Sequence, residues 1–371
     1  MKFAVITHVT HKETTKGLFA YEPYVREMNL WLNHVDEAKI IAPKINSELS
    51  KIDAAYKGKR IFLTEVPYFN LISFKGKIKS IGKIPIVFIK IMRAMAWADH
   101  IHVRCPGNVG LLGCIAQIAF PSKPKTIKYA GNWDPKSKQP KSYNFQKWIV
   151  SNTFLTKNCQ VLVYGEWENQ SKNIKPFFTA SYWKTDIKKN AVKTLEETIN
   201  FIFVGTFSEG KQPLLSVKVL EVLFKKGLKV HLNMYGDGEQ FETVSKYVNN
   251  NALSQVVTLH GNTKKEIVQK AFEKSHFLLF ISKSEGWPKV VAEAMFWNCL
   301  PITSKVSCVP FMLGNETRGA LVSNDVTSII EKVELYLNNA DLYKDHVSNA
   351  QKWSQEYTLD KFEEEIQKLL Q

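Results

Sequence analysis

The sequence is poor in the features that mark membrane-spanning, disulfide-stabilised and low-complexity proteins. It has no run of about 18 apolar residues, so we expect no membrane-spanning helix. With 18 Gly and 14 Pro among 371 residues, a collagen-like or disordered chain is excluded. The length of 371 residues is enough for two domains with full cores, and the hydrophobic content of 44% is ordinary for a globular protein.

Cysteines are few and form no recognisable framework. There are five, an odd number, and no CxxC pair occurs among them. We therefore expect buried, reduced thiols in a cytoplasmic protein. The first ten residues, MKFAVITHVT, hold one lysine and a short apolar run, which predicts a first β-strand rather than a signal peptide.

Acidic residues are scarce in the first half of the chain. Residues 1–200 contain 31 Lys and Arg against 15 Asp and Glu, whereas residues 201–371 contain 19 against 20. This asymmetry indicates that the first half faces an anionic partner. The run 74–93, FKGKIKSIGKIPIVFIKIMR, predicts a basic amphipathic helix. It would lie on an anionic inner membrane surface or, alternatively, pack its isoleucine face against the core.

Short apolar runs alternate with helical patterns, which is typical of parallel β-α-β units. In the first half, strands are expected at 3–7, 38–42, 60–64, 100–103, 125–129 and 160–164. In the second half, they are expected at 200–204, 230–235, 256–260, 277–282, 300–304 and 319–322. The last segment, 341–370, has a helical pattern with a break near 357–358.

The pattern of strands occurs twice, and the polar stretch 184–198 separates the two sets. The predicted fold class is therefore α/β, with two doubly wound Rossmann-like domains facing each other across a cleft. The expected domains are 1–190 and 197–345, followed by a helical segment at 346–371. In such sheets, ligands bind at the carboxyl ends of the strands.

The stretch 284–295, SEGWPKVVAEAM, holds two glutamates eight positions apart. The buried strand before it places Glu285 on a strand-end loop. Gly286 permits a tight turn, and Pro288 suits the first position of a helix, which puts Glu293 in the second helical turn. The backbone N–H groups at the start of this helix form a ready anion site. Taken alone, such a pair is more often a capping acid and a solvated helix face.

Three further strand-end turns occur before this stretch. FIFVGTFSEGK (201–211) ends in Lys211, MYGDGEQF (234–241) resembles half of a dinucleotide fingerprint, and LHGN (259–262) ends another strand with a glycine. Each signal is weak by itself, because a strand-end turn with a surface lysine or glycine is common.

Together, the segments VGTFSEGK, YGDGE, LHGN, SEGWPKVVAEAM and LPITS resemble, in this order, the donor half of glycosyltransferase family 4. Members of that family are retaining enzymes of the GT-B fold, in which a C-terminal helix crosses back to the N-terminal domain. The resemblance covers about 200–325 and implies an N-terminal acceptor domain and a C-terminal donor domain. It implies that Glu285 contacts the donor sugar, Glu293 the ribose and Lys211 the diphosphate.

The resemblance also implies which residues bind the donor. They are Gly205, Thr206, Lys211, Gly236, Gly261, Asn262, Glu285, Gly286, Trp287, Pro288 and Glu293. The sequence departs from the family at Thr206, where many relatives have an arginine for the phosphates. Neutralising charge would therefore come from Lys211 and the helix start, and we expect Glu285 and Lys211 to be catalytic.

The first half matches the family less well. Relatives often have one histidine after the fourth strand and another after the fifth, whereas Arg104 and Ala130 stand at these positions. Arg104 is the third candidate catalytic residue. The long, mixed stretch 8–28 is expected to be a loop that either borders the acceptor or is simply flexible. The candidate acceptor-side residues are His8, Tyr24, Arg26, Asn108 and Asn132.

The resemblance implies front-face transfer of a sugar, with retention, from a nucleotide-diphosphate sugar to a glycan or lipid-linked acceptor in the synthesis of cell-surface polysaccharide or glycoconjugates. No D-x-D motif is present, so no metal is expected, and no cofactor is implied. The expected location is cytoplasmic, with peripheral contact to the inner face of the membrane.

Other functions remain alternatives at this point. One is a catalytically silent GT-B scaffold or sugar-nucleotide-binding partner, and another is a different GT-B reaction such as epimerisation. Phosphorolysis is disfavoured because no pyridoxal-phosphate lysine motif is recognisable. A nucleic-acid binder is disfavoured too, since no RNP, helix-turn-helix or zinc-ligand pattern accompanies the basic half.

Overall fold

The computed structural model describes residues 1–50, 52–68, 82–188 and 191–371, which divide into two compact units. Unit 1 comprises Met1–Phe178 and Phe362–Gln371, and unit 2 comprises Thr179–Lys361. The division falls before the polar stretch 184–198, in which residues 189–190 lie outside the described residues. Residues 74–81 of the basic run lie outside them as well.

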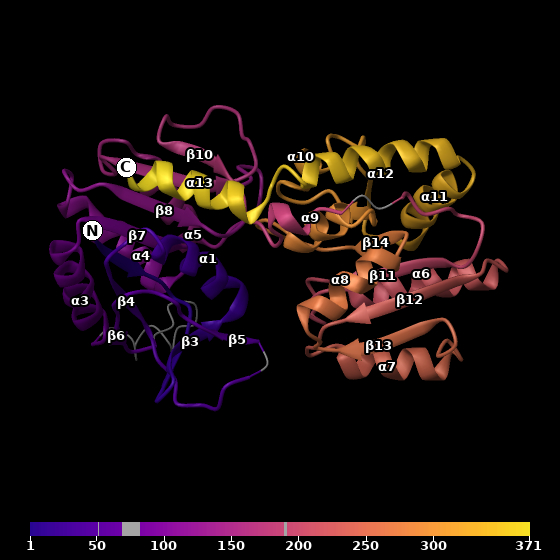
Figure 1. Ribbon diagram of the computed structural model, residues 1–371, viewed down its shortest axis with the longest axis horizontal. Coiled ribbons are helices and arrows are strands. Elements are labelled where there is room, and N and C mark those ends of the chain that lie inside the picture. The colour runs from indigo at the N-terminus through magenta and orange to yellow at the C-terminus, as the bar shows by residue number, and fades with distance from the viewer. Residues whose placement is uncertain (51, 69–81, 189–190) are drawn as a thin grey trace. The chain divides into compact units, whose positions relative to one another are not determined.

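Unit 1 contains a seven-stranded parallel sheet in the order β10-β9-β8-β7-β1-β4-β6 (Figure 1). Its strands are β1 (Lys2–Ile6), β4 (Glu37–Pro43), β6 (Ile61–Val66), β7 (His100–Cys105), β8 (Lys125–Tyr129), β9 (Cys159–Tyr164) and β10 (Ile174–Phe177). The first strand lies in the interior of the sheet, and Phe3, Val5 and Ile6 are fully buried. This explains why β1 reads as an uninterrupted apolar run.

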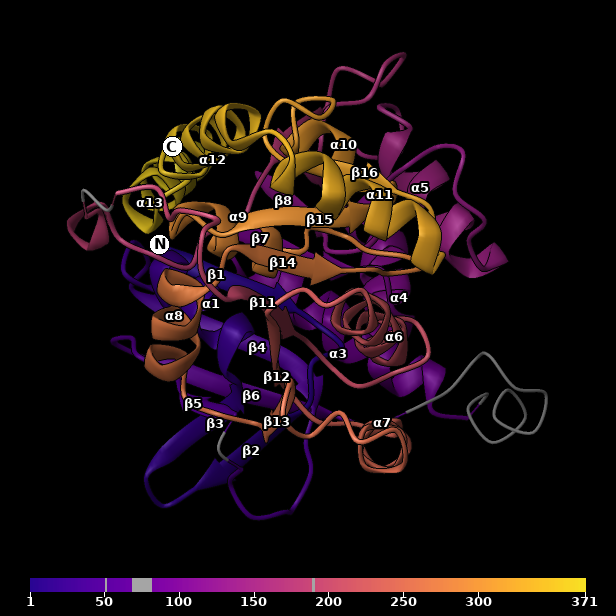
Figure 2. The same cartoon turned by 90° about the vertical axis from the view of Figure 1, so that its right-hand side faces the viewer.

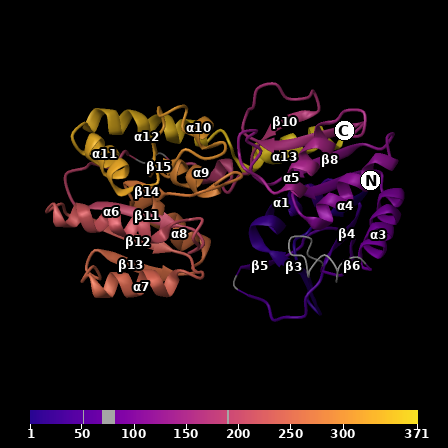
Figure 3. The same ribbon diagram turned by 180° about the vertical axis from the view of Figure 1, so that it is seen from behind.

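The helices of unit 1 cover both faces of this sheet. They are α1 (Glu22–Leu32), α3 (Ile84–Trp97), α4 (Asn108–Ala116), the short 3₁₀ helix η1 (Gln117–Ala119) and α5 (Lys141–Ser151). The chain runs outward from β1 through α1, then returns and continues the other way through α3, α4 and α5. Right-handed crossovers therefore place α1 on one face and the other three helices on the opposite face. There α4 packs against both α3 and α5 (Figures 1 and 3).

The stretch 8–28 is not the long loop that the sequence predicted. It forms the strands β2 (His11–Thr14) and β3 (Gly17–Tyr21) and the start of α1, and β5 (Asp53–Ala55) completes a small antiparallel sheet. Interactions distant in sequence hold this sheet, since Lys12 Nζ lies 2.7 Å from Asp53 Oδ2 and the buried His11 ring contacts the Tyr56 hydroxyl at 2.7 Å. The periodicity of apolar residues along a short stretch of sequence does not predict such distant contacts.

Unit 2 contains a six-stranded parallel sheet in the order β13-β12-β11-β14-β15-β16, which can be followed in Figure 2. Its strands are β11 (Ile199–Val204), β12 (Val230–Tyr235), β13 (Val257–Gly261), β14 (Phe277–Phe280), β15 (Leu300–Ser304) and β16 (Ala320–Val322). Its helices are η2 (Lys184–Asp186), α6 (Pro213–Lys225), α7 (Phe241–Asn250), α8 (Lys265–Lys274), α9 (Lys289–Phe296), α10 (Val309–Met312), α11 (Val326–Leu337) and α12 (Ala340–Ser354).

Each strand that the sequence predicted is present, with ends shifted by at most two residues, and β10 was not predicted. Both sheets have the doubly wound order, which confirms the predicted α/β class. The predicted helical tail is α12 followed by α13 (Leu359–Leu370), and the chain breaks between them as expected. Phe362 on α13 packs on Phe177 and Phe178, so the last helix returns to unit 1.

The five cysteines are free and buried, as the sequence predicted. Burial raises the pKa of Cys299 and of Cys308 to about 12, so both are unreactive thiols at neutral pH. Among the described residues, no helix is long and apolar enough to cross a membrane.

Candidate functional site

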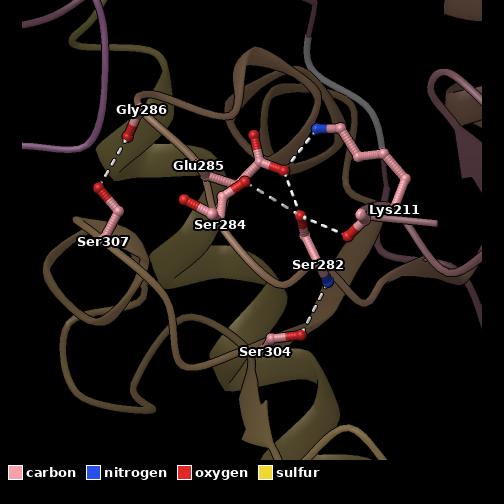
Figure 4. Close-up of polar contacts among 8 residues, drawn as sticks. Lys211, Ser282, Ser284, Glu285, Gly286, Ser304 and Ser307 are labelled. Atoms are coloured by element: carbon pink, nitrogen blue, oxygen red, sulfur yellow. Dashed lines mark hydrogen bonds and ion pairs between the residues drawn. The ribbon is translucent and has the colours of Figure 1, made fainter. Parts of the chain in front are cut away.

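The loops that follow β11, β14 and β15 meet at the carboxyl ends of these strands in unit 2 (Figure 4). The backbone N–H of Lys283 donates to the Gly210 carbonyl at 2.9 Å, which joins the loops after β14 and β11. The backbone N–H of Ser282 donates to Ser304 Oγ at 2.9 Å, which joins the loop after β14 to the end of β15. These bonds fix the position of the loop that carries Glu285.

Glu285 and Lys211 form an ion pair, with Lys211 Nζ 2.5 Å from Glu285 Oε1. The hydroxyl of Ser282 lies 2.5 Å from the same carboxylate oxygen (Figure 4). It therefore donates there in preference to the backbone carbonyls of Gly210 and Ser284, which lie 3.2 and 3.3 Å away. Only 10% of the Glu285 side chain and 25% of the Lys211 side chain are exposed. The resemblance implied both residues as site residues, and the structure brings them together.

Lys211 also lies over an aromatic ring. Its Nζ is 4.5 Å from the centre of the Phe280 ring at the end of β14, which adds a cation–π contact. A second pair, Lys283 and Glu209, joins the same two loops nearer the surface at 2.5 Å, with both side chains more than half exposed. The loop after β11 is therefore held to the loop after β14 by two ion pairs and a backbone bond.

The residues after Glu285 lead into α9. The Gly286 carbonyl accepts hydrogen bonds from Ser307 Oγ at 3.1 Å and Cys308 Sγ at 3.2 Å. Pro288 is the N-cap of α9 rather than its first helical residue, a shift of one position from the prediction. Pro288 offers no side-chain cap, so the positive end of the helix dipole stays available to an anion.

Trp287 has a packing role that the sequence did not reveal. Its side chain is buried and lies 6.3 Å from the Trp353 ring and 5.9 Å from the Tyr357 ring, measured between ring centres. These partners lie on α12 and in the turn after it. The indole therefore anchors the turn that precedes α9, whereas the resemblance implied only donor contact for this residue.

Glu293 lies in the second turn of α9, as predicted. Its hydrogen-bond partner is different from Lys211 and Ser282, the partners of Glu285. Its Oε1 accepts a hydrogen bond from Ser181 Oγ at 2.5 Å. The carbonyl of Ser181 in turn accepts from Lys265 Nζ on α8, and that Nζ lies 4.5 Å from the centre of the Tyr182 ring. The two glutamates thus have separate environments, each with its own serine.

Glycines at the ends of β11, β12 and β13 bring three loops into direct backbone contact. A Cβ atom on Gly236 would lie 1.9 Å from the Gly205 carbonyl oxygen, so any other residue would push these loops apart. The Gly236 N–H donates to the Gly261 carbonyl at 2.9 Å. Gly261 has open space around it but a φ of +66°, a conformation that favours glycine. Thr206 and Asn262 are exposed beside these turns.

The candidates of unit 1 divide into a cluster and isolated residues. Arg104 lies within β7 rather than on the loop after it, and its guanidinium is 4.9 Å from the centre of the Tyr24 ring on α1. The neighbouring His102 points into the core and contacts Thr126 Oγ1 at 2.9 Å. His8 follows β1, and burial together with the nearby Arg104 lowers its pKa to about 4. Arg104 and Tyr24 are thus brought together at the carboxyl end of the sheet.

The remaining acceptor-side candidates have local partners. Arg26 pairs with Glu22 one turn earlier on α1. The side chain of Asn132 accepts from the Asp134 N–H at 2.9 Å and so closes its own turn. Asn108 is the first residue of α4. For Arg26 and Asn132, these contacts describe local structure and supply no evidence of ligand binding.

Three serines were missed by the sequence analysis. Ser282 and Ser304 end the apolar runs of β14 and β15, and this recurring position is the signal that could have marked them. Ser181 precedes the second domain's first strand and left no local signal, because its partner Glu293 is 112 residues away.

Residues 184–353 match the family model described as "Glycosyl transferases group 1". The match covers just under half of the chain. The matched region contains Lys211, Glu285 and Glu293 together with the loops that hold them. The resemblance to glycosyltransferases is thereby confirmed, and the assignment to family 4 stays a prediction.

Two curated relatives are similar to about half of the chain. An uncharacterized glycosyltransferase of Haemophilus influenzae is 27% identical over 190 residues, which cover 50% of this chain and 52% of the relative. A Campylobacter jejuni protein named GalNAc-alpha-(1->4)-GalNAc-alpha-(1->3)-diNAcBac-PP-undecaprenol alpha-1,4-N-acetyl-D-galactosaminyltransferase is 24% identical over 208 residues, covering 55% and 56%. The chain therefore matches about half the length of each of these relatives.

The fold agrees with that of a solved structure over its full length. The crystal structure of HepE from Anabaena in complex with UDP and glucose superposes with a TM-score of 0.70, covering 100% of this chain and 99% of HepE. At 11% identity this likeness concerns the fold alone. The fold is GT-B, with two Rossmann-like units.

Proposed function

We propose that the protein is a retaining glycosyltransferase that moves a sugar from a nucleotide-diphosphate sugar to a glycan or lipid-linked acceptor. The observation that carries this proposal is the Lys211–Glu285 pair at the carboxyl ends of β11 and β14, beside the start of α9. A cation and a carboxylate at this edge of a doubly wound sheet match the two ends of a sugar diphosphate.

The pair also explains how a donor would be accommodated. A diphosphate would attract Lys211 Nζ, and a sugar hydroxyl would donate to Glu285, so each residue would exchange its partner for the ligand. Ser282 Oγ would continue to orient the carboxylate during this exchange, because it lies 2.5 Å from Oε1. The ligand-free ion pair keeps both charges compensated until the donor arrives.

Cleavage of the bond between sugar and diphosphate builds negative charge on the leaving phosphate. Lys211 and the positive end of α9 would stabilise that charge more strongly in the transition state than in the ground state. Both carboxylates are assigned to donor binding, Glu285 at the sugar and Glu293 at the ribose. Neither is then left as the nucleophile of a double displacement, and this favours front-face transfer with retention.

We extend the proposal to the metal and the acceptor. In the described part of the chain, no group of three or more His, Cys, Asp or Glu residues could hold a metal ion, and we propose metal-independent transfer without a cofactor. The name of the Campylobacter jejuni relative includes a PP-undecaprenol-linked saccharide, which supports a lipid-linked acceptor here. The reaction would then serve cell-surface glycan synthesis in the cytoplasm, with peripheral contact at the inner membrane face.

A catalytically silent sugar-nucleotide-binding protein is the second candidate. The resemblance implies that Thr206 stands where many relatives have a phosphate-binding arginine, and that Arg104 and Ala130 stand where they often have histidines. A silent protein would bind the donor without turnover. Donor binding and turnover are therefore measured separately.

The first experiment is a thermal-shift panel of UDP-, GDP- and ADP-sugars. We expect one nucleotide class to raise the Tm of the wild type and to bind about tenfold more weakly to Glu293→Ala, because a charge-assisted hydrogen bond is lost. Glu334→Ala, which removes a surface pair with Lys226, is the matched control and should bind normally. If no nucleotide sugar stabilises the wild type, the proposal fails.

The second experiment measures turnover. Release of nucleotide from the bound donor should continue in the presence of EDTA, and Lys211→Ala should lower kcat by roughly 10²-fold or more. The anomeric configuration of the product, determined by NMR, tests retention. Donor binding without hydrolysis or transfer to any lipid-linked or glycan acceptor would favour the silent candidate.

A further inference from the structure

Helix α5 of unit 1 turns large aromatic side chains outward. Its inward side is apolar as usual, with Ile149 and Val150 buried. On the outward stripe, however, 45% of Phe145 and 57% of Trp148 are exposed, and their rings stack with centres 5.8 Å apart. Phe154, in the turn after the helix, is 76% exposed. A surface helix normally presents polar residues on this stripe.

Helix α3 shows the same inversion on the same face of the sheet. Its inward side chains include the buried Val87 and Ile91, while 53% of Ile86 and 49% of Ile89 are exposed. Arg93 is exposed one turn further along. Both α3 and α5 pack against α4, so their outward sides belong to one layer (Figures 1 and 3). We call the exposed side chains Ile86, Ile89, Arg93, Phe145, Trp148 and Phe154 the α3–α5 face.

The charge on this layer has one sign. The sequences of α3, α4 and α5 contain no Asp or Glu, and none occurs between residues 135 and 165. Lys141 at the start of α5 and Lys157 after it are exposed, and Lys157 Nζ lies 5.0 Å from the centre of the Phe154 ring. The α3–α5 face is therefore apolar and cationic together, a combination that suits an anionic apolar partner.

The opposite face of the sheet has the reverse character. There α13 carries four acidic residues against two lysines, and it contacts the end of α1 through Glu363 and His34 at 2.9 Å. Helix α1 adds Glu22 and Glu27. Among the described helices of unit 1, acidic residues therefore occur in α1 and α13 and are absent from α3, α4 and α5.

A lipid surface accounts for all of these side chains. Tryptophan and phenylalanine partition into the boundary between headgroups and acyl chains, and lysine and arginine bind anionic headgroups while their stems lie along apolar surface. Single-stranded nucleic acid would use the aromatic rings and the cations, but it would leave the aliphatic Ile86 and Ile89 without a role.

We infer that the α3–α5 face docks unit 1 onto an anionic lipid bilayer, with Phe154 and Trp148 inserted at the headgroup boundary. The inference rests on the membrane contact in the proposed function and identifies the surface that makes it. It needs no residue of the Lys211–Glu285 site, so docking and sugar transfer are measured independently.

The test is co-sedimentation of the full chain with vesicles. We expect binding to phosphatidylcholine vesicles that contain phosphatidylglycerol, little binding to phosphatidylcholine alone, and weakening of binding by salt. Trp148→Ser/Phe154→Ser and Lys141→Glu/Lys157→Glu should each weaken partitioning about tenfold or more. The matched controls lie in unit 2: Ile267→Ser/Leu335→Ser removes similarly exposed apolar groups, and Lys229→Glu/Lys344→Glu changes exposed lysines. Both should bind like the wild type.

Insertion is tested with a label at the turn. Because the five native cysteines are buried, an environment-sensitive maleimide dye should react selectively with Phe154→Cys. Its emission should shift to the blue on anionic vesicles, whereas a label on Ile267→Cys should not respond. An unchanged Tm in each variant shows that the fold is intact.

The outcomes separate the two levels of the inference. If vesicle binding persists in both Trp148→Ser/Phe154→Ser and Lys141→Glu/Lys157→Glu, the α3–α5 face is not the docking surface, although the protein still contacts membranes. No binding of the wild type to anionic vesicles overturns both, and salt-sensitive binding to single-stranded DNA in its place would make nucleic acid the partner. None of these results bears on donor binding, which the thermal-shift panel decides.

Discussion

Lys211 and Glu285 are 74 residues apart in the chain, and their charged atoms lie 2.5 Å apart between the loops after β11 and β14. Ser282 Oγ contacts the same Glu285 oxygen. The carboxylate therefore has a fixed position before any ligand binds. Because the Ser282 contact would persist when the donor replaces Lys211, it would reduce the reorganisation of the carboxylate that donor binding requires.

A double-mutant cycle on Lys211→Ala and Glu285→Ala should show coupling in the ligand-free protein. We expect the unfolding free energy to show a coupling of about 1 kcal/mol, because both side chains are mostly buried and the hydrogen bond between them joins two charged groups. The exposed pair Lys226–Glu334 is the control cycle and should show about 0.5 kcal/mol or less. Urea unfolding measures both cycles. Equal coupling would mean that the Lys211–Glu285 contact is no stronger in the ligand-free protein than an exposed surface pair.

Ser304→Ala should destabilise unit 2, because the buried N–H of Ser282 would lose its acceptor. The expected cost is about 1–3 kcal/mol of unfolding free energy. Thr303→Val is the matched control one residue earlier, since Thr303 Oγ1 is buried with no hydrogen-bond partner among the described residues. It should be neutral or slightly stabilising. Thermal and urea unfolding give the unfolding free energies of the two variants. A similar loss for both changes would argue against the Ser282–Ser304 contact.

Gly236→Ala and Gly261→Ala should differ strongly in their effects. At Gly236 the new Cβ would lie 1.9 Å from the Gly205 carbonyl, so we expect a loss of about 3 kcal/mol and disturbed donor binding. At Gly261 nothing lies within 4 Å, so only the left-handed backbone is penalised, at about 1 kcal/mol. Tm and nucleotide binding of the two variants provide the comparison. A milder effect at Gly236 than at Gly261 would contradict the close contact of these loops.

Unit 1 should lose stability as the pH falls from about 6.5 toward 4. Burial lowers the pKa of His8, His11 and His100 to about 4, with the nearby Arg104 adding to the effect at His8, and it holds the pKa of His102 well below 6.5. In this window the unfolded chain binds protons that the folded chain does not, so the contribution is complete above pH 6.5 and declines below it. The slope is about 1.4 kcal/mol per pH unit for each histidine.

Amide hydrogen exchange in β7 reports this loss. His100→Phe keeps an aromatic ring beside Phe3 and removes one of the four titrating histidines, so the slope should become less steep by about a quarter. If the slope is the same in wild type and variant, the buried histidines do not control the acid response of unit 1.

Much of the fold could be predicted from the sequence, because the relevant signals are local. Buried parallel strands read as short apolar runs wherever they occur, and glycine turns mark their carboxyl ends. The doubly wound class, the position of Glu285 on a strand-end loop and the position of Glu293 in the second turn of α9 follow from this. The small antiparallel sheet of β2, β3 and β5 could not be found in this way, since its strands are short and mixed in character.

The sequence by itself determined the strands of the two parallel sheets other than β10, and it determined which residue types stand at the strand ends. Only the tertiary structure decided that Glu285 pairs with Lys211 whereas Glu293 contacts Ser181, and that Phe145 and Trp148 point outward. The physical reason is the range of the interactions. Hydrophobic periodicity acts over a few residues, whereas an ion pair, a serine contact or an uncovered helix face depends on how distant elements pack against one another.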